Sequence, residues 1–280
     1  MRGFIPFVLL GAAGLAGGPP AGQAPHAPAR ALHVTFDELA PGPYTQAAAA
    51  AHWPGLKWFG LAERGAIVAG EKNPAQRFLE VKYPAGKFGP AANGGQFLVS
   101  LPPRDEWYLD YFVMFLPGFD FRLGGKLPGL TGNGSLSTGG HNHPGEAWSA
   151  RYMWHRRGAV VVYLYHMDQK GKYGDSLPLE GCTFVPGRWH RLTQRVRVNT
   201  GEDRNGLIQV WFDLKKVVDR ADLRLRSAPK APVDSFYFST FHGGSTGDWA
   251  PKNDGAVRFD DFLITANERE ALSPARKPPE

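Results

Sequence analysis

WSARYMWHRRGAVVVYLY, Trp148 to Tyr165, has the pattern of a β-hairpin and points to an all-β chain. Both arms are rich in aromatic and β-branched residues. The three residues between them, 156–158, fit a hairpin loop whose glycine takes the left-handed conformation. If His155 then pairs with Ala159, the register of the whole hairpin follows.

Four polar side chains share one face of this hairpin. In the expected register Arg151 lies opposite Tyr163, and Ser149 lies opposite Tyr165. Alternation with period two keeps all four on the same side, and opposed Cβ atoms lie about 5 Å apart. The spacing suits a reaction site. The alternative is that the tyrosines are half-buried strand aromatics with Arg151 stacked on them as a surface cation.

The rest of the chain repeats the strand pattern. Short runs of apolar and polar alternation, separated by Gly, Pro, Asn and Asp, extend from ALHVTF at 31–36 to AVRFDDFLIT at 256–265. About ten strands are expected, and the only helical pattern is a short one over Ala47–Ala51. These features predict a single-domain β-sandwich or jelly roll over residues 32–268, followed by a disordered tail at 269–280.

The N-terminus differs from the remainder. Residues 1–24 carry an early arginine, an apolar run and then small residues, as in a cleaved signal peptide, and residues 25–31 form a linker. We expect an exported, soluble monomer, periplasmic or released, with no membrane association. The single Cys182 excludes an intramolecular disulfide, so core packing must stabilise the fold.

The charge balance favours an anionic partner. A net charge of +6 and a pI near 9.4 are spread along the chain and form no dense block. No nucleic-acid recognition module is present in the sequence, so nucleic acid is not expected as a partner. An acidic polysaccharide suits spaced cations and aromatic residues better.

A lysine in a glycine-rich segment is the next candidate. FDFRLGGKLPGL, Phe119–Leu130, follows an almost wholly apolar stretch at 108–116 that is expected to be covered on both faces. Its Gly-Gly pair and proline predict a loop in which Lys126 lies where backbone and substrate approach closely. The alternative is an ordinary exposed loop lysine.

Taken together, GGKLPGL at 124–130, SARYMW at 149–154 and YLY at 163–165 resemble polysaccharide lyase family 14 and its relatives, the alginate and glucuronan lyases. YPAGKFGPAANGGQF at 83–97, PGRWHRLTQRVRVNT at 186–200 and FSTFHGG at 238–244 are also similar, so the resemblance spans most of 32–265. It implies a β-jelly roll. The site that it implies consists of Lys126, Ser149, Arg151, Tyr163 and Tyr165.

Elimination at a 4-linked uronic acid needs a group that neutralises the C6 carboxylate, a base for the C5 proton and an acid for the departing O4. We assign Tyr163 or Tyr165 as base and acid, Lys126 and Arg151 as the neutralising cations, and Ser149 as an orienting hydrogen-bond partner. The cations are expected to lower the tyrosine pKa. Alginate, as polymannuronate, and glucuronan both remain open as the substrate.

Two further residues are assigned to substrate binding. Gln96 lies on an expected strand and can hydrogen-bond a carboxylate, and His242 precedes a glycine pair that could line the same groove. For both residues the alternative is a structural role.

Other chemistries have less support. A hydrolase needs two carboxylates flanking the bond, and only Asp260-Asp261 or Glu106 with Asp110 come near that pattern. His141-x-His143 resembles a ligand pair, but a polar loop readily carries two exposed histidines, so no metal and no cofactor are expected. The main rival is a non-catalytic binding module for acidic polysaccharides, which would use the same aromatic residues and cations without turnover.

Overall fold

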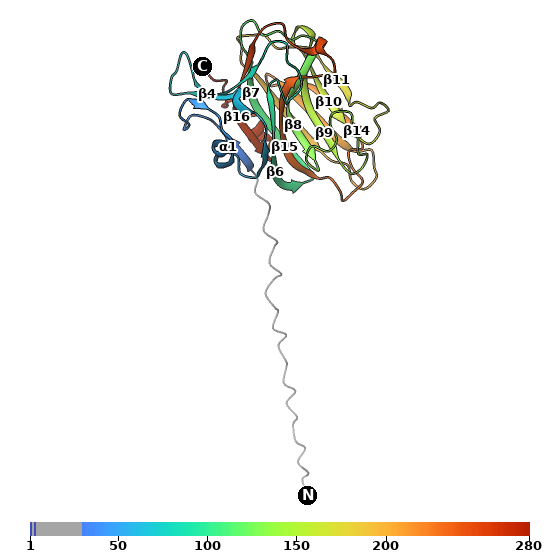
Figure 1. The fold of residues 1–280 in the computed structure, drawn as a ribbon. Helices are drawn as coiled ribbons and strands as arrows, with labels where there is room; N and C mark the ends of the chain where they lie inside the picture. Colours follow the sequence, from blue (N-terminus) through green and yellow to red (C-terminus); the bar gives the residue numbers. More distant parts are fainter. Residues whose placement is uncertain (2, 4–29) are drawn as a thin grey trace.

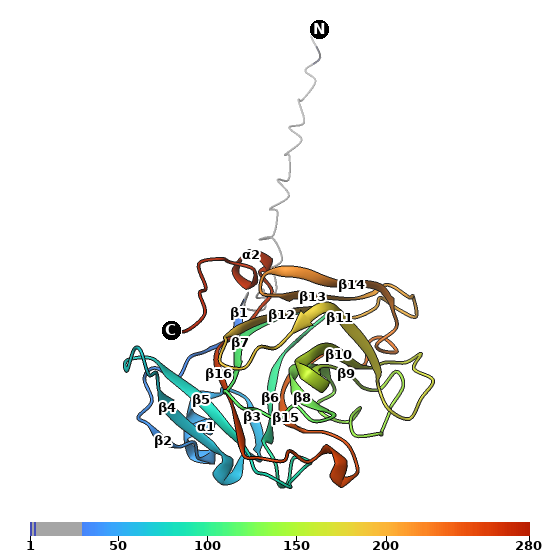
Figure 2. The ribbon, with the colours of Figure 1, turned by 90° about the horizontal axis from the view of Figure 1, so that it is seen from above.

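Two antiparallel β-sheets packed face to face make up the computed structural model, which describes residues 1, 3 and 30–280 (Figures 1 and 2). The smaller sheet has seven strands in the order β11-β10-β9-β8-β15-β6-β3. The larger sheet has nine, in the order β14-β13-β12-β7-β16-β5-β4-β2, with β1 also paired to β16. This is the predicted all-β jelly roll, built from more strands than expected.

The strands of the smaller sheet are β3 (Leu56–Phe59), β6 (Gly95–Arg104), β8 (Gly124–Gly132), β9 (Trp148–His155), β10 (Ala159–Tyr165), β11 (Asp175–Thr183) and β15 (Val233–His242). Those of the larger sheet are β1 (Arg30–Val34), β2 (Gly42–Pro43), β4 (Gly65–Ala69), β5 (Arg77–Tyr83), β7 (Glu106–Phe115), β12 (His190–Arg197), β13 (Gly206–Phe212), β14 (Lys215–Leu223) and β16 (Gly255–Thr265). The helices are α1 (Gln46–His52), which was predicted, and α2 (Glu268–Ala271), with 3₁₀ segments at Ala62–Arg64, Arg156–Gly158 and Gly247–Trp249.

Aromatic side chains fill the space between the sheets. Phe97 of β6 stacks on Phe238 of β15 with ring centroids 4.4 Å apart, and Phe259 of β16 packs edge-on against Phe238 at 5.0 Å. All three rings are fully buried. Because side chains alternate along a strand, the neighbours of these residues on β6 and β15 lie on the opposite face of the smaller sheet. We call that face, which points away from the larger sheet, the outer face.

The hairpin has the predicted register. Tyr163 pairs with Arg151 and Tyr165 with Ser149. In the connecting segment Gly158 has φ of 79°, as expected, and Arg157 is also left-handed, with φ of 59°. The four side chains therefore lie on one face of the sheet, as the alternation requires.

The segment around Lys126 is a strand, which corrects the expectation of a loop. Strand β8 lies between β9 and β15 in the smaller sheet, with a register shift between Leu127 and Gly129. A Cβ built on Gly129 would lie 2.1 Å from the Ala150 carbonyl oxygen, so the glycine permits close approach of the neighbouring backbone. The glycines mark tight strand packing here, and they mimic a loop signal in the sequence.

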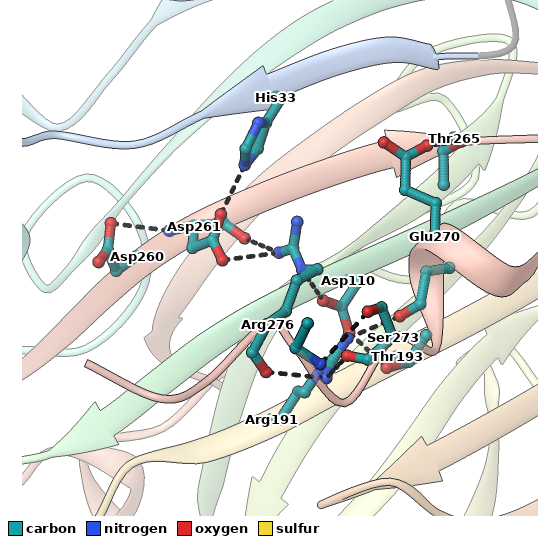
Figure 3. Close-up of polar contacts among 12 residues, drawn as sticks. His33, Asp110, Arg191, Thr193, Asp260, Asp261, Thr265, Glu270, Ser273 and Arg276 are labelled. Carbon is teal, nitrogen blue, oxygen red and sulfur yellow. Dashed lines mark hydrogen bonds and ion pairs between the residues drawn. The ribbon is translucent and has the colours of Figure 1, made fainter. Parts of the chain in front are cut away.

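The C-terminal residues pack against the larger sheet, which corrects the expectation of a disordered tail (Figure 3). Arg276 pairs with Asp110 of β7 at 3.0 Å and with Asp261 of β16 at 3.1 Å. Arg191 of β12 also binds Asp110, at 2.8 Å, and donates to the Ser273 carbonyl oxygen at 2.8 Å. The carboxylate of Asp110 is fully buried, so the cation brought by the tail compensates its charge.

Burial of both faces of β7 explains why its sequence is almost wholly apolar. All of its residues except Glu106 and Met114 are buried. One face packs in the core, and Tyr108 on the other face joins Trp211 and Ala271 in a small apolar cluster beneath α2. The predicted coverage on both faces is confirmed, with the C-terminal segment as the second cover.

The expected signal peptide at 1–24 and most of the linker at 25–31 lie outside the described residues. Strand β1 begins at Arg30, so the folded domain starts slightly before residue 32. In the described part of the chain, no helix has the length and apolar character needed to cross a membrane.

Candidate active site

The predicted cluster lies on the outer face of the smaller sheet. Met153, Tyr163 and Tyr165 pack together there, separately from the main core. The residues that alternate with them along the strands, such as Tyr152 and Leu164, point the other way into the core. Alternation along β9 and β10 thus separates reactive groups from packing groups.

The two tyrosine hydroxyls lie close together and each accepts a backbone hydrogen bond. Their oxygens are 3.4 Å apart, and the rings are perpendicular with centroids 5.5 Å apart. The amide of Gly174 donates to the Tyr163 oxygen at 3.2 Å, and the amide of Gly140 donates to the Tyr165 oxygen at 2.8 Å. Two loops therefore hold the phenols in position.

Lys126 reaches this pair from β8. Its Nζ lies 3.6 Å from the centroid of the Tyr163 ring and 2.8 Å from the Met153 sulfur. Burial lowers the pKa of Lys126 well below its usual value, and the nearby Arg151 guanidinium lowers it further. The amine can therefore lose its proton more easily than a surface lysine.

Arg151 is buried beneath the cluster. Its Nη1 donates to the Ser239 hydroxyl at 3.0 Å, while its Nε and Nη2 have no hydrogen-bond partner among the described residues. The guanidinium carbon lies 5.3 Å from the Tyr237 ring centroid and 5.9 Å from that of Tyr163. A desolvated cation with unused donors is poised to attract an anion.

The expected lowering of the tyrosine pKa is corrected for Tyr163. Burial raises the pKa of its hydroxyl above the ordinary value of 10.0, and the hydrogen bond and proximity of Tyr165 raise it further. Arg151 acts in the opposite direction but is a smaller influence. Desolvation of the phenolate outweighs the attraction of the cation, so the free site holds a protonated phenol.

Ser149 and Gln96 occupy different parts of the cluster. The Ser149 hydroxyl is buried and donates to the Ser137 carbonyl oxygen at 2.7 Å, so it anchors the loop that carries Gly140. Gln96 is half-buried on β6 and donates to the Ser239 hydroxyl at 3.1 Å. Gln96 and Arg151 thus share one serine.

His242 does not face this cluster, which corrects its predicted place in substrate binding. It is fully buried on the core side of β15, with Phe119 stacked against its ring at 5.3 Å. Its Nε2 contacts the Asp120 carbonyl oxygen at 2.7 Å and its Nδ1 contacts Asn93 at 3.1 Å. Burial lowers its pKa to about 4, as for a neutral core histidine.

Sequence reasoning missed three members of the cluster. Met153 follows Arg151 by two residues and shares its face, so the hairpin register contained that signal. Tyr237 and Ser239 alternate with core phenylalanines on β15, but their approach to Arg151 depends on the pairing of β15 with β8. His141 and His143 are exposed, and no three potential metal ligands converge within the described residues.

Comparison with known proteins agrees with the fold. The family model for polysaccharide lyase 14 matches residues 71–262. The structure of alginate lyase Aly36B is similar, with a TM-score of 0.73 and 25% identity over 84% of this chain and 96% of that chain. The marine PL-14 alginate lyase from Aplysia kurodai has a TM-score of 0.71 and 25% identity over 85% of this chain and 99% of that one.

A more distant structure shares the fold alone. The endo-β-1,4-glucuronan lyase from the fungus Trichoderma reesei has a TM-score of 0.55 and 13% identity, over 86% of this chain and 98% of that chain. A comparison with curated proteins found no match.

Proposed function

The chain belongs to polysaccharide lyase family 14, and we propose that it cleaves a 4-linked uronic acid polymer by β-elimination at Lys126, Arg151, Tyr163 and Tyr165. The observation that carries this proposal is the placement of a buried guanidinium and a buried amine beside two phenols on the outer face. Neither basic group has an ion-pair partner among the acidic side chains of the described residues. A bound carboxylate would supply the negative charge that Arg151 lacks.

The proposed chemistry starts with the C6 carboxylate. Arg151 attracts this group with its unused donors, so that negative charge can develop on the carboxylate as the C5 proton leaves. The electron pair from the C5–H bond then forms the C4–C5 double bond, and the C4–O4 bond breaks. The departing O4 takes up a proton, which leaves an unsaturated sugar at the new end.

The opposite pKa shifts favour a division of the two proton transfers. A lysine with a lowered pKa is the better acceptor for the C5 proton at neutral pH, and a phenol with a raised pKa is the better donor to O4. We therefore propose Lys126 as base and Tyr163 as acid, with Tyr165 as its hydrogen-bonded neighbour. This revises the assignment of both transfers to a tyrosine.

Alginate is the substrate that we propose first. The two relatives at 25% identity are alginate lyases, and a double variant of Aly36B has been solved with an alginate tetrasaccharide. In β-linked mannuronate the C5 proton and O4 lie on the same side of the ring, which suits groups that approach from one sheet face. Glucuronan shares that arrangement and is the second candidate.

The test is a time course of ultraviolet absorbance with polymannuronate, polyguluronate and glucuronan. We expect unsaturated product from polymannuronate, and a loss of about 100-fold or more in kcat for Tyr163→Phe and Lys126→Ala. Tyr108→Phe on the larger sheet is the matched control and should keep full activity. Binding without product on all three polymers would favour the non-catalytic module, and full activity of Tyr163→Phe would remove this phenol from the mechanism.

We also propose that residues 1–24 direct export and are removed. Sequencing the N-terminus of protein recovered outside the cytoplasm would locate the cleavage site. An intact Met1 on the exported protein would contradict this.

A further inference from the structure

We propose that Trp58 forms a second sugar-binding subsite, away from the reacting tyrosines, for an anionic polysaccharide that lies across the strands of the smaller sheet. The inference rests on the proposed function, because it assumes the same class of substrate. It assigns a role to an exposed aromatic side chain that the elimination itself does not use.

The strand register places Trp58 in line with the reacting cluster. Each residue of one row is the paired partner of the next on the adjacent strand, and in order from the sheet edge the row is Trp58, Leu98, Tyr237, Gly129, Arg151 and Tyr163. The row crosses β3, β6, β15, β8, β9 and β10, which lie side by side in Figure 2. A straight path across the sheet therefore links the two sites.

Side-chain contacts run along this row. The Trp58 ring packs edge-on against Tyr237 with centroids 5.9 Å apart. Tyr237 in turn lies beneath the Arg151 guanidinium at 5.3 Å, and Arg151 lies 5.9 Å from the Tyr163 ring. Trp58 thus belongs to the outer face and not to the core that Phe59 joins.

The spacing suits an extended polymer. The contacts along the row place the Trp58 ring at most ~17 Å from the Tyr163 ring, which is about three to four strand intervals. A 4-linked pyranose is about as long as one such interval, so Trp58 lies up to roughly three sugar residues from the reacting sugar. A disaccharide bound at Tyr163 cannot reach it, whereas a polymer can.

The exposure of Trp58 suits stacking on a sugar. Its relative exposure is 36%, whereas Leu98 and Tyr237 beside it in the row are 8% and 4% exposed. The indole therefore stands at the edge of the sheet above a buried floor. The apolar C–H face of a pyranose can cover the indole while its carboxylate and hydroxyls stay in water.

The experiment compares polymer with a short substrate. For Trp58→Ala we expect a rise in KM for high-mass polymannuronate of about fivefold, the size expected for the loss of one aromatic contact, with unchanged kcat. Its kcat/KM for a dimannuronate should match the wild type, which also shows that the fold and reacting cluster are intact. Trp58→Phe should restore much of the polymer affinity, and Val185→Ala, an exposed apolar side chain outside the row, should have no effect.

Two outcomes would overturn the subsite. One is an unchanged KM for polymer in Trp58→Ala, and the other is an equal loss on polymer and disaccharide, which would indicate a structural role. If the wild type forms no unsaturated product, the proposed function fails separately. Electrophoresis through gels that contain polymannuronate then decides the subsite: retardation that Trp58→Ala loses supports it, and equal migration of the two proteins refutes it.

Discussion

Arg151 has a buried charge that the fold does not neutralise. Its Nε and Nη2 have no partner in the described residues, and the groups that stabilise its charge are the rings and hydroxyls of tyrosines. Removing a guanidinium from water costs several kcal/mol unless hydrogen bonds and an opposite charge replace the lost hydration. We infer that the fold tolerates this cost because the substrate carboxylate completes the site.

Replacing this charge should separate stability from activity. Arg151→Met keeps much of the volume and removes the desolvated charge, so we expect the free energy of unfolding to rise by about 1 kcal/mol or more. Activity on polymannuronate should be abolished. Urea unfolding and the absorbance assay measure the two effects, and a variant less stable than the wild type would contradict this interpretation of the charge.

The pH dependence of kcat/KM should reveal the role of Lys126. If its neutral amine takes the C5 proton, activity rises with pH and reaches a plateau at a pH well below 10.5, because burial and Arg151 lower the lysine pKa. Activity of Lys126→Ala should be partly restored by a small primary amine in the buffer. If Lys126 acts only as a cation, activity instead falls as pH rises through that pKa.

Besides Asp110 of β7, the fold has a second buried carboxyl group, Asp260 of β16, near the point where the register of β16 with β7 shifts. Asp260 is 6% exposed, and its Oδ1 accepts the amide hydrogen of Asp261 at 2.7 Å. Burial raises the pKa of Asp260 to about 8, and that single hydrogen bond offsets only part of the effect. The shift between Asp260 and Leu263 places this side chain where it is largely shielded from water.

The free energy of unfolding of the protein should therefore decrease as pH rises. Because the folded-state pKa is raised, Asp260 stabilises the protein most below its ordinary pKa of 3.8, and this contribution is lost as pH rises toward about 8. Asp260→Asn keeps the acceptor oxygen but cannot ionise, so we expect it to be more stable than wild type by at least about 1 kcal/mol at pH 9. Thermal unfolding at pH 5 and pH 9 tests this, and an equal difference at both values would refute it.

The two sheets divide the work of the molecule. The smaller sheet carries the reacting cluster on its outer face, whereas the outer face of the larger sheet binds the C-terminal segment through Asp110, Arg191 and Arg276 (Figure 3). The core between them separates these two regions. Changes at the C-terminal segment should therefore alter stability without altering the chemistry.

Arg276→Ala tests this separation. The variant leaves Asp110 buried with one cation fewer, so we expect a loss of about 2–3 kcal/mol in the free energy of unfolding. The kcat of the folded protein on polymannuronate should stay within about twofold of wild type. Lys277→Ala, which removes a neighbouring exposed cation, is the matched control, and a selective fall in kcat for Arg276→Ala would show that the two regions are coupled.

Much of the fold and part of the site could be predicted because the relevant information is local. The hairpin joins its strands through three residues, so one turn sets the pairing of Arg151 with Tyr163 and of Ser149 with Tyr165. The strand character of Gly124–Gly132 could not be predicted in this way. Its glycines give no alternating pattern, and they are explained only by the backbones of β9 and β15, which come later in the chain.

Local alternation was enough to predict the all-β class, the hairpin register and a shared face for Arg151 and the two tyrosines, since side-chain direction in a strand has period two. Only the packing of distant strands turned His242 into the core, docked Arg276 on the larger sheet and shifted the pKa values of Lys126 and Tyr163 in opposite directions. Burial depends on the neighbours supplied by the whole fold, and the cost of removing a charge from water cannot be inferred from the order of residues alone.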